Sequence, residues 1–183
     1  MTLRLITAPA TEPVSSAEAK LHLKVDGSTD DTLISALIVA ARMLCEAYQG
    51  RGYITQTWEL TLDAFPESPF ELPPAPLASV VSIKYTDSGG TEYTMDPGDY
   101  VLDTSAEPGR VALADGVSWP SVVLYPVGGV KIRYTVGAAS AAAVPQNVKQ
   151  AILLTVGDWY EDRQAGAALS PAARALLTID RVF

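Results

Sequence analysis

Three carboxylates near the C-terminus, Asp158, Glu161 and Asp162, have the type and spacing that could support catalysis. Residues three and four apart on a helix share a face, so two of these carboxylates can meet. Paired carboxylates can run acid–base chemistry or hold a hard metal ion, as in a small metal-dependent hydrolase or nuclease. The alternative is a solvated acidic face beside Arg163, the usual role of charged runs on helices.

The single histidine, His22, and the single cysteine, Cys45, add little chemistry. His22 could serve as a base for Ser15 or Ser16 with Asp26 orienting it, but Ser15 has the position of a helix cap. Cys45 falls on an apolar helical stripe and is expected in the core. Neither an intrachain disulfide nor a Cys/His zinc site can form, and no glycine-rich phosphate loop is present. We predict no catalytic residue, no metal, no cofactor, and hence no enzyme.

The composition points to a packed acidic protein. Of 183 residues, 48% are hydrophobic and 19% are charged, which is enough apolar material for one domain. The net charge of -8 argues against a protein that grips nucleic acid by its phosphates. Residues 53–136 carry four basic and eleven acidic side chains. An acidic binding protein that mimics DNA is therefore another alternative.

The N-terminus lacks the basic and apolar regions of a secretory signal. The apolar runs are shorter than the roughly 18 residues that cross a bilayer. We expect a soluble protein of the cytoplasm with no membrane partner.

Two helices are predicted near the N-terminus. The first covers residues 15–23, with Ser15 in a capping-box pattern. The second is capped by Ser28 or Thr29 and ends before Gly50, which has the position of a left-handed C-cap. Its apolar stripe consists of Leu33, Ile34, Leu37, Ile38, Ala41, Cys45 and Tyr48.

From residue 53 the hydrophobic period changes to two, which indicates strands. The alternation puts Trp58, Leu60 and Leu62 on a buried face and Glu59 on the opposite one. Val81 is likewise expected to face inward together with Ile83 and Tyr85. The predicted strands lie near residues 57–63, 81–86, 91–95, 100–102, 111–113 and 130–136.

Two further helices are predicted after a small-residue segment. Pro145 sits in the first turn of one, whose stripe is Val148, Ile152, Thr155, Val156 and Trp159. Ser170 caps a last short helix that ends near Leu177. The chain is predicted to be a single α+β domain. Its N- and C-terminal helices, in residues 1–52 and 145–183, form a helical bundle with an inserted antiparallel β subdomain over 53–136 and a hinge over 137–144.

The order of motifs along about 150 residues is specific, although each piece alone is common. The pieces are Pro13-Val14-Ser15, Glu18-Ala19-Lys20, Leu23, Asp30-Asp31, Leu33-Ile34, Ile54-Thr55-Gln56-Thr57-Trp58-Glu59-Leu60, Asp63, Phe65-Pro66, Leu72-Pro73, Pro76-Leu77, Ser79-Val80, Ser82-Ile83, Tyr85, Trp119-Pro120, Ile152-Leu153-Leu154 and Trp159-Tyr160. In this order the chain resembles the head–tail connector (adaptor) proteins of long-tailed phages and of phage-derived gene transfer agents.

The resemblance implies a structural adaptor in a virion or phage-like particle. Its subunits would wait in the host cytoplasm and then form a ring, twelvefold in the particle, beneath the portal protein. The ring would join the DNA-filled head to a tail-side stopper or tail completion protein. DNA would pass through its channel without specific binding.

The C-terminal tail is the predicted partner-binding segment. Three of its last six residues are apolar, which is unusual for a terminus without a partner. Tails of related connectors reach a neighbouring subunit or the portal, so Ile179, Arg181, Val182 and Phe183 are assigned to such a contact by resemblance. The alternative is that the apolar residues fold back onto this protein's own helices.

Overall fold

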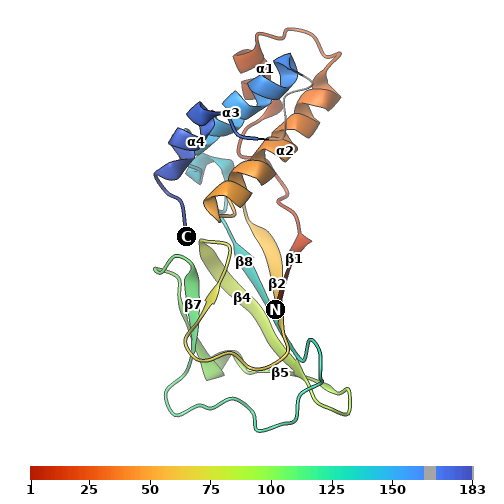
Figure 1. Cartoon of the computed structure of the whole chain (residues 1–183), viewed down its shortest axis with the longest axis vertical. Coiled ribbons are helices and arrows are strands. Elements are labelled where there is room, and N and C mark those ends of the chain that lie inside the picture. Colours follow the sequence, from red (N-terminus) through yellow and green to blue (C-terminus); the bar gives the residue numbers. More distant parts are fainter. Residues whose placement is uncertain (163–167, 183) are drawn as a thin grey trace. The chain divides into compact units, whose positions relative to one another are not determined.

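The computed structural model describes residues 1–162 and 168–182. Its helices are α1 (Ser16–Leu23), α2 (Asp31–Gln49), α3 (Gln146–Glu161) and α4 (Pro171–Thr178), with 3-10 turns at Pro97–Asp99 and Ala141–Ala143 (Figure 1). Its strands are β1 (Thr2–Thr7), β2 (Gln56–Leu62), β3 (Phe70–Leu72), β4 (Leu77–Thr86), β5 (Glu92–Thr94), β6 (Tyr100–Asp103), β7 (Gly109–Leu113) and β8 (Val130–Val136). The predicted α+β class is confirmed.

The chain divides into two compact units, which are described separately. The β unit comprises residues 1–8 and 55–137, and the helical unit comprises residues 9–54 and 138–183. The assignment of residues 1–8 to the helical part is wrong, because β1 pairs antiparallel with β2 and extends the sheet. This pairing is long-range, so the local pattern of the first ten residues gives no sign of it.

The β unit contains two antiparallel sheets. The larger has the strand order β1-β2-β8-β4-β5 and the smaller has the order β3-β7-β6. Their buried residues form one core: Leu60, Leu72, Leu77, Ile83, Met95, Tyr100, Val111, Val130, Ile132, Tyr134 and Val136. β7 and β4 approach so closely that a Cβ on Gly109 would lie 2.2 Å from the Cβ of Leu77. Glycine is therefore required at this contact.

The predicted alternation is confirmed in β8, where every second residue from Val130 is buried. In β2 the predicted faces hold, since Leu60 belongs to the core and Glu59 lies on the opposite face, but Glu59 is only 6% exposed because two arginines pair with it there. The prediction is wrong in β4, where the pairing register with β8 shifts between Val80 and Ser82. The shift leaves Val81 56% exposed while Ile83 stays buried.

The helical unit begins with the predicted capping box. Ser15 accepts a hydrogen bond from the Glu18 amide, and the Glu18 side chain accepts one from the Ser15 amide. The predicted cap of α2 is wrong: Asp30 precedes the helix and makes no side-chain capping bond. Its carboxylate instead accepts a hydrogen bond from the Tyr160 hydroxyl at 2.6 Å.

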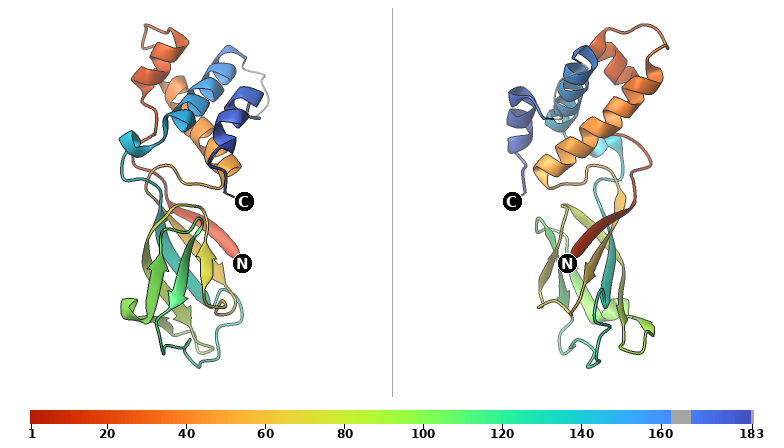
Figure 2. Two further views of the ribbon diagram at one scale, coloured as in Figure 1. Left: turned by 90° about the vertical axis from the view of Figure 1, so that its left-hand side faces the viewer. Right: turned by 45° about the vertical axis from the view of Figure 1, so that its right-hand side comes forward.

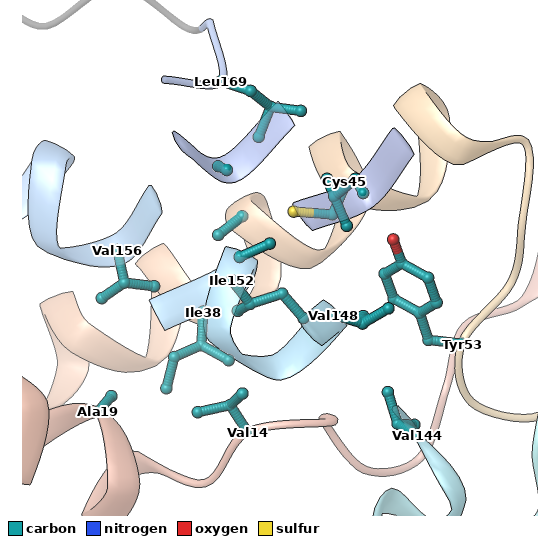
Figure 3. Packing of buried hydrophobic residues seen from close by; sticks show 14 of the residues in the cluster. Val14, Ala19, Ile38, Cys45, Tyr53, Val144, Val148, Ile152, Val156 and Leu169 are labelled. Carbon is teal, nitrogen blue, oxygen red and sulfur yellow. The ribbon is translucent and has the colours of Figure 1, made fainter. Parts of the chain in front are cut away.

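The four helices pack against one another (Figure 2), and all of them contribute side chains to one core, part of which is drawn in Figure 3. The inner face of α2 packs on α3, whose predicted stripe is buried except for the partly buried Trp159. Leu33 departs from its predicted place and is 38% exposed. Gly50 adopts the predicted left-handed conformation, with φ of 70°, and Ser170 caps α4. The shared buried residues are Val14, Ala19, Ile34, Ile38, Ala41, Cys45, Tyr53, Ile54, Val144, Val148, Ala151, Ile152, Val156, Leu169, Ala173 and Leu177.

The predicted hinge, residues 137–144, starts at a glycine with φ of 92°. The Ala138 amide donates to the Tyr53 carbonyl, and Ala141–Ala143 forms a 3-10 turn. Its role as a hinge stays a prediction.

Candidate partner-binding surfaces

The described part of the C-terminal tail lies along the end of α2. The Val182 amide donates to the Gln49 carbonyl oxygen at 2.9 Å, and the Arg51 side chain donates to the Asp180 carbonyl at 2.6 Å. The Arg181 guanidinium lies 4.5 Å from the centre of the Tyr48 ring. The last carbonyls of a helix lack partners within the helix, and the tail supplies one.

The four predicted tail residues therefore lie in different environments. Arg181 and Val182 contact the end of α2, whereas Ile179 is 74% exposed. Phe183, the predicted aromatic anchor, lies outside the described residues. Docking of the tail on a neighbour stays a prediction, and Ile179 is the described apolar side chain that is available for it.

The end of α2 that receives the tail is built from buried polar groups. Gln49 is fully buried, donates from Nε2 to the Leu177 carbonyl at 2.7 Å, and accepts from the Tyr53 hydroxyl at 2.7 Å. A Cβ on Gly50 would lie 3.2 Å from the Val182 carbonyl oxygen. Gly50 thus allows both the left-handed turn and the close approach of the tail.

The candidate catalytic carboxylates lie on the surface of the helical unit. Asp158, Glu161 and Asp162 are all exposed near the end of α3. Among residues 1–162 and 168–182, no group of three or more His, Cys, Asp and Glu side chains is placed to hold a metal ion. Arg163, the expected neighbour of these carboxylates, lies outside the described residues.

The other residues considered for catalysis, Ser15, His22 and Cys45, lie in a helix cap, on an exposed helix face and in the core. The Ser15 hydroxyl bonds to Glu18 within the capping box, and His22 is exposed on α1. Cys45 is fully buried, and burial raises the pKa of its thiol to about 12. A thiol with such a pKa is protonated at neutral pH and is a poor nucleophile. Cys45 is the core residue that its position on the stripe predicts.

The outer face of the larger sheet carries a charged groove that the alternation pattern did not reveal. The β unit has five basic and eleven acidic side chains, and four of the five basic ones line this groove. The groove has a volume of about 180 Å³ and is lined by Arg4, Glu59, Ser82, Lys84, Glu92, Lys131 and Arg133. Cross-strand register brings these residues together from β1, β2, β8, β4 and β5.

Glu59 is the central anion of this groove. It accepts from Arg133 at 2.5 Å and from Arg4 at 3.1 Å. Burial opposes its charged form, but the two arginines outweigh burial and hold the pKa of Glu59 below its ordinary value. Lys84 and Lys131 face each other across the strands, and Glu92 lies between them, 2.6 Å and 4.0 Å away. The charged side chains of the groove therefore pair with one another, and the groove keeps a small net positive charge.

No described helix is both long and apolar enough to span a membrane. No family model matches the chain, and no curated protein matches it.

Solved structures do match, over the whole length. One is the neck of an empty gene transfer agent (GTA) particle computed with C6 symmetry, at 26% identity and a TM-score of 0.83. Another is the neck of the native GTA particle computed with C12 symmetry, at 29% identity and a TM-score of 0.81. A chain from the native GTA virion matches at 29% identity and a TM-score of 0.79. Each match covers 100% of this chain and 96% of the other. These similarities support a structural neck component of a gene transfer agent virion.

Proposed function

We propose that this protein is a head–tail adaptor that forms a ring beneath the portal of a phage-like particle and joins the head to the tail. The observation that carries the proposal is the full-length similarity to chains of two GTA necks, with TM-scores of 0.83 and 0.81, and to a chain of a native GTA virion, with a TM-score of 0.79. Both units of the chain are included in that match. The proposal thus concerns the whole protein and does not depend on one shared subdomain.

The proposal of a ring is supported by the symmetry of the similar assemblies. Necks computed with C6 and C12 symmetry contain repeated copies around one axis. A ring of identical chains uses heterologous contacts, in which two different surfaces of each copy meet. Many weak contacts of this kind become strong together on a template. We therefore expect a monomer in dilute solution and a closed ring in the particle.

The portal, the tail-side completion protein and the passing DNA are the proposed neighbours. An adaptor must touch a partner on each side, and the exposed tail residue Ile179 offers one such contact. The β unit, with five basic and eleven acidic side chains, would repel a DNA duplex close to it. DNA could then slide through the channel without being held.

Deletion of the gene tests this function in the organism that encodes it. We expect DNA-filled heads without attached tails, seen by negative-stain electron microscopy, and full recovery when the gene is returned on a plasmid. Normally tailed particles from the deletion strain would overturn the proposal. A loss of heads altogether would also overturn it, because an adaptor acts after the head has formed.

A further inference from the structure

From residue 36 to residue 47, the outward face of α2 is uncharged and apolar, whereas the first turns of the helix expose Thr32 and Ser35. Successive residues of a helix are turned by about 100°, which places five exposed residues within an arc of about 100°. These residues, called the α2 face below, are Ala36, Val39, Ala40, Met43 and Ala47. Met43 is 55% exposed and Val39 is 39% exposed.

The charges of α2 are placed elsewhere on the helix. Its three charged residues are Asp31, Arg42 and Glu46. Asp31 lies in the first turn, and Arg42 is buried, where it pairs with Glu12 at 2.7 Å and with Glu46 at 2.5 Å. A helix on a protein surface ordinarily turns its charges outward and its apolar residues inward. The placement of Arg42 and Met43 is the reverse, which makes the α2 face a candidate contact surface.

A second candidate surface, with a mixed polar and apolar lining, lies between α1 and α3. It is a groove of about 280 Å³ whose apolar lining residues are Val14, Leu21 and Leu153. Of these, Val14 is buried at the base of the groove. The polar lining residues are Glu18, His22, Gln146, Lys149 and Gln150. Leu21 is 82% exposed, an unusual position for a leucine in a helix that is packed on two others.

The two surfaces lie on different sides of the helical unit. The inner residues of α2, such as Ile38 and Cys45, pack toward α3, so the α2 face points away from α3. The groove belongs to the outer side of α3, with Gln146 and Gln150 exposed on it. A ring with rotational symmetry needs two such different surfaces on every copy.

The small size of the α2 face fits a contact between copies in a ring. Residues 36–47 of a helix cover about 17 Å by 10 Å, or roughly 200 Å². A stable two-protein interface needs roughly 800 Å² on each partner. The α2 face alone is thus too small for a stable dimer in solution, but it suffices where ring closure adds many contacts.

We propose that, in the ring, the α2 face of one copy packs into the α1–α3 groove of the next copy. The occupant of each surface is thus a second copy of this chain. This inference rests on the proposed ring, and it names the surfaces that close it.

Cysteine cross-linking in purified particles tests the pairing. The native Cys45 is fully buried, so a wild-type ring gives no background. The test protein carries both Met43→Cys and Leu21→Cys, and the particles are oxidised mildly and run on a non-reducing gel. We expect a ladder of cross-linked oligomers. Each single variant should give no ladder, and Met43→Cys with Arg174→Cys on the exposed side of α4 should give none either.

Different failures have different meanings. A Met43→Cys single variant that forms dimers would overturn the pairing, since it would show α2 faces meeting each other. Particles that contain the double variant but give no ladder would overturn the pairing while leaving the adaptor function intact. Absence of the protein from tailed particles would overturn the adaptor function as well.

A charge on the α2 face provides a second measurement. Met43→Glu should leave the melting temperature of the monomer unchanged, because Met43 is exposed. Its incorporation into particles should fall about tenfold or more, which corresponds to about 1.4 kcal/mol. Met43→Leu is the matched control and should be incorporated normally. Normal incorporation of Met43→Glu would overturn the pairing.

Discussion

The side-chain oxygen of Gln49 accepts a hydrogen bond from the Tyr53 hydroxyl at 2.7 Å, and both residues are buried. Gln49 also donates to the Leu177 carbonyl, and its own carbonyl accepts the Val182 amide. One residue thus links α2, the segment that follows it, α4 and the C-terminal tail. The position of the tail depends on this buried polar group.

Gln49→Leu is expected to lower the free energy of unfolding by about 1–3 kcal/mol. The substitution leaves the Leu177 carbonyl without its side-chain donor in a buried site, and unpaired buried polar groups cost about this much. Gln150→Leu on the exposed side of α3 is the matched control and should change stability by less than about 0.5 kcal/mol. Urea denaturation measures both, and equal stabilities would contradict this role of Gln49.

The Glu59 ion pairs predict a specific loss of stability in acid. The pKa of Glu59 is lower in the folded protein than in the unfolded chain, whose value is about 4.3. Its contribution is therefore present above the unfolded pKa and is lost as the pH falls through the folded pKa. At pH 7, Glu59→Gln should cost about 1.5–3 kcal/mol, as expected for hydrogen bonds to charged groups.

The pH profile separates this effect from general acid denaturation. Between pH 7 and pH 3, wild type should lose more stability than Glu59→Gln, because the variant has no carboxylate to protonate there. Glu67→Gln in an exposed loop should follow the wild-type profile. Parallel curves for wild type and Glu59→Gln would contradict the assignment.

Gly109→Ala should destabilise the β unit. A Cβ at this position would lie 2.2 Å from the Leu77 Cβ and 2.9 Å from its Cδ2, so β7 and β4 would have to separate. Overpacking of this kind costs about 1–3 kcal/mol. Gly116→Ala is the control for the alternative that any glycine substitution in the unit is harmful. A Cβ on Gly116 would have no neighbour within 4 Å, so this variant suffers only the backbone strain of an alanine at φ of 73°. The larger loss should be at Gly109, and the cost of Gly109→Ala should shrink in a Leu77→Gly background, because that background lacks the Cβ that causes the shortest contact.

Ile179→Asp tests the docking of the tail. Ile179 is 74% exposed, so the melting temperature should stay close to that of wild type. The fraction of tailed particles should nevertheless fall, because burying a charged group without a partner opposes docking. Ile179→Val is the control and should give normal particles. Normal tailing of Ile179→Asp would remove Ile179 from the predicted contact.

Sequence patterns correctly predicted the features that are determined by residues close together in the chain. The capping box at Ser15, the left-handed turn at Gly50 and the alternation in β8 are all set by residues within a few positions of each other. The buried position of Cys45 follows from its place on the apolar stripe.

Sequence patterns did not predict the features that depend on residues far apart in the chain. β1 is a strand because it pairs with β2, more than 50 residues away. Glu59 is buried because β1 and β8 place Arg4 and Arg133 on either side of it, which alternation within β2 cannot reveal. The exposure of Val81 follows from a register shift against β8. The candidate carboxylates at Asp158 and Glu161 show the converse, since suitable spacing alone did not produce a metal-binding group within the part of the chain that the structure describes.

A cryo-electron microscopy reconstruction of the neck of purified particles shows directly whether this chain is the adaptor. We expect density for this chain as a closed ring between the portal and the tail, with both the helical unit and the β unit accounted for in every copy. Density for this chain elsewhere in the particle, or tailed necks that lack it, would contradict the adaptor function.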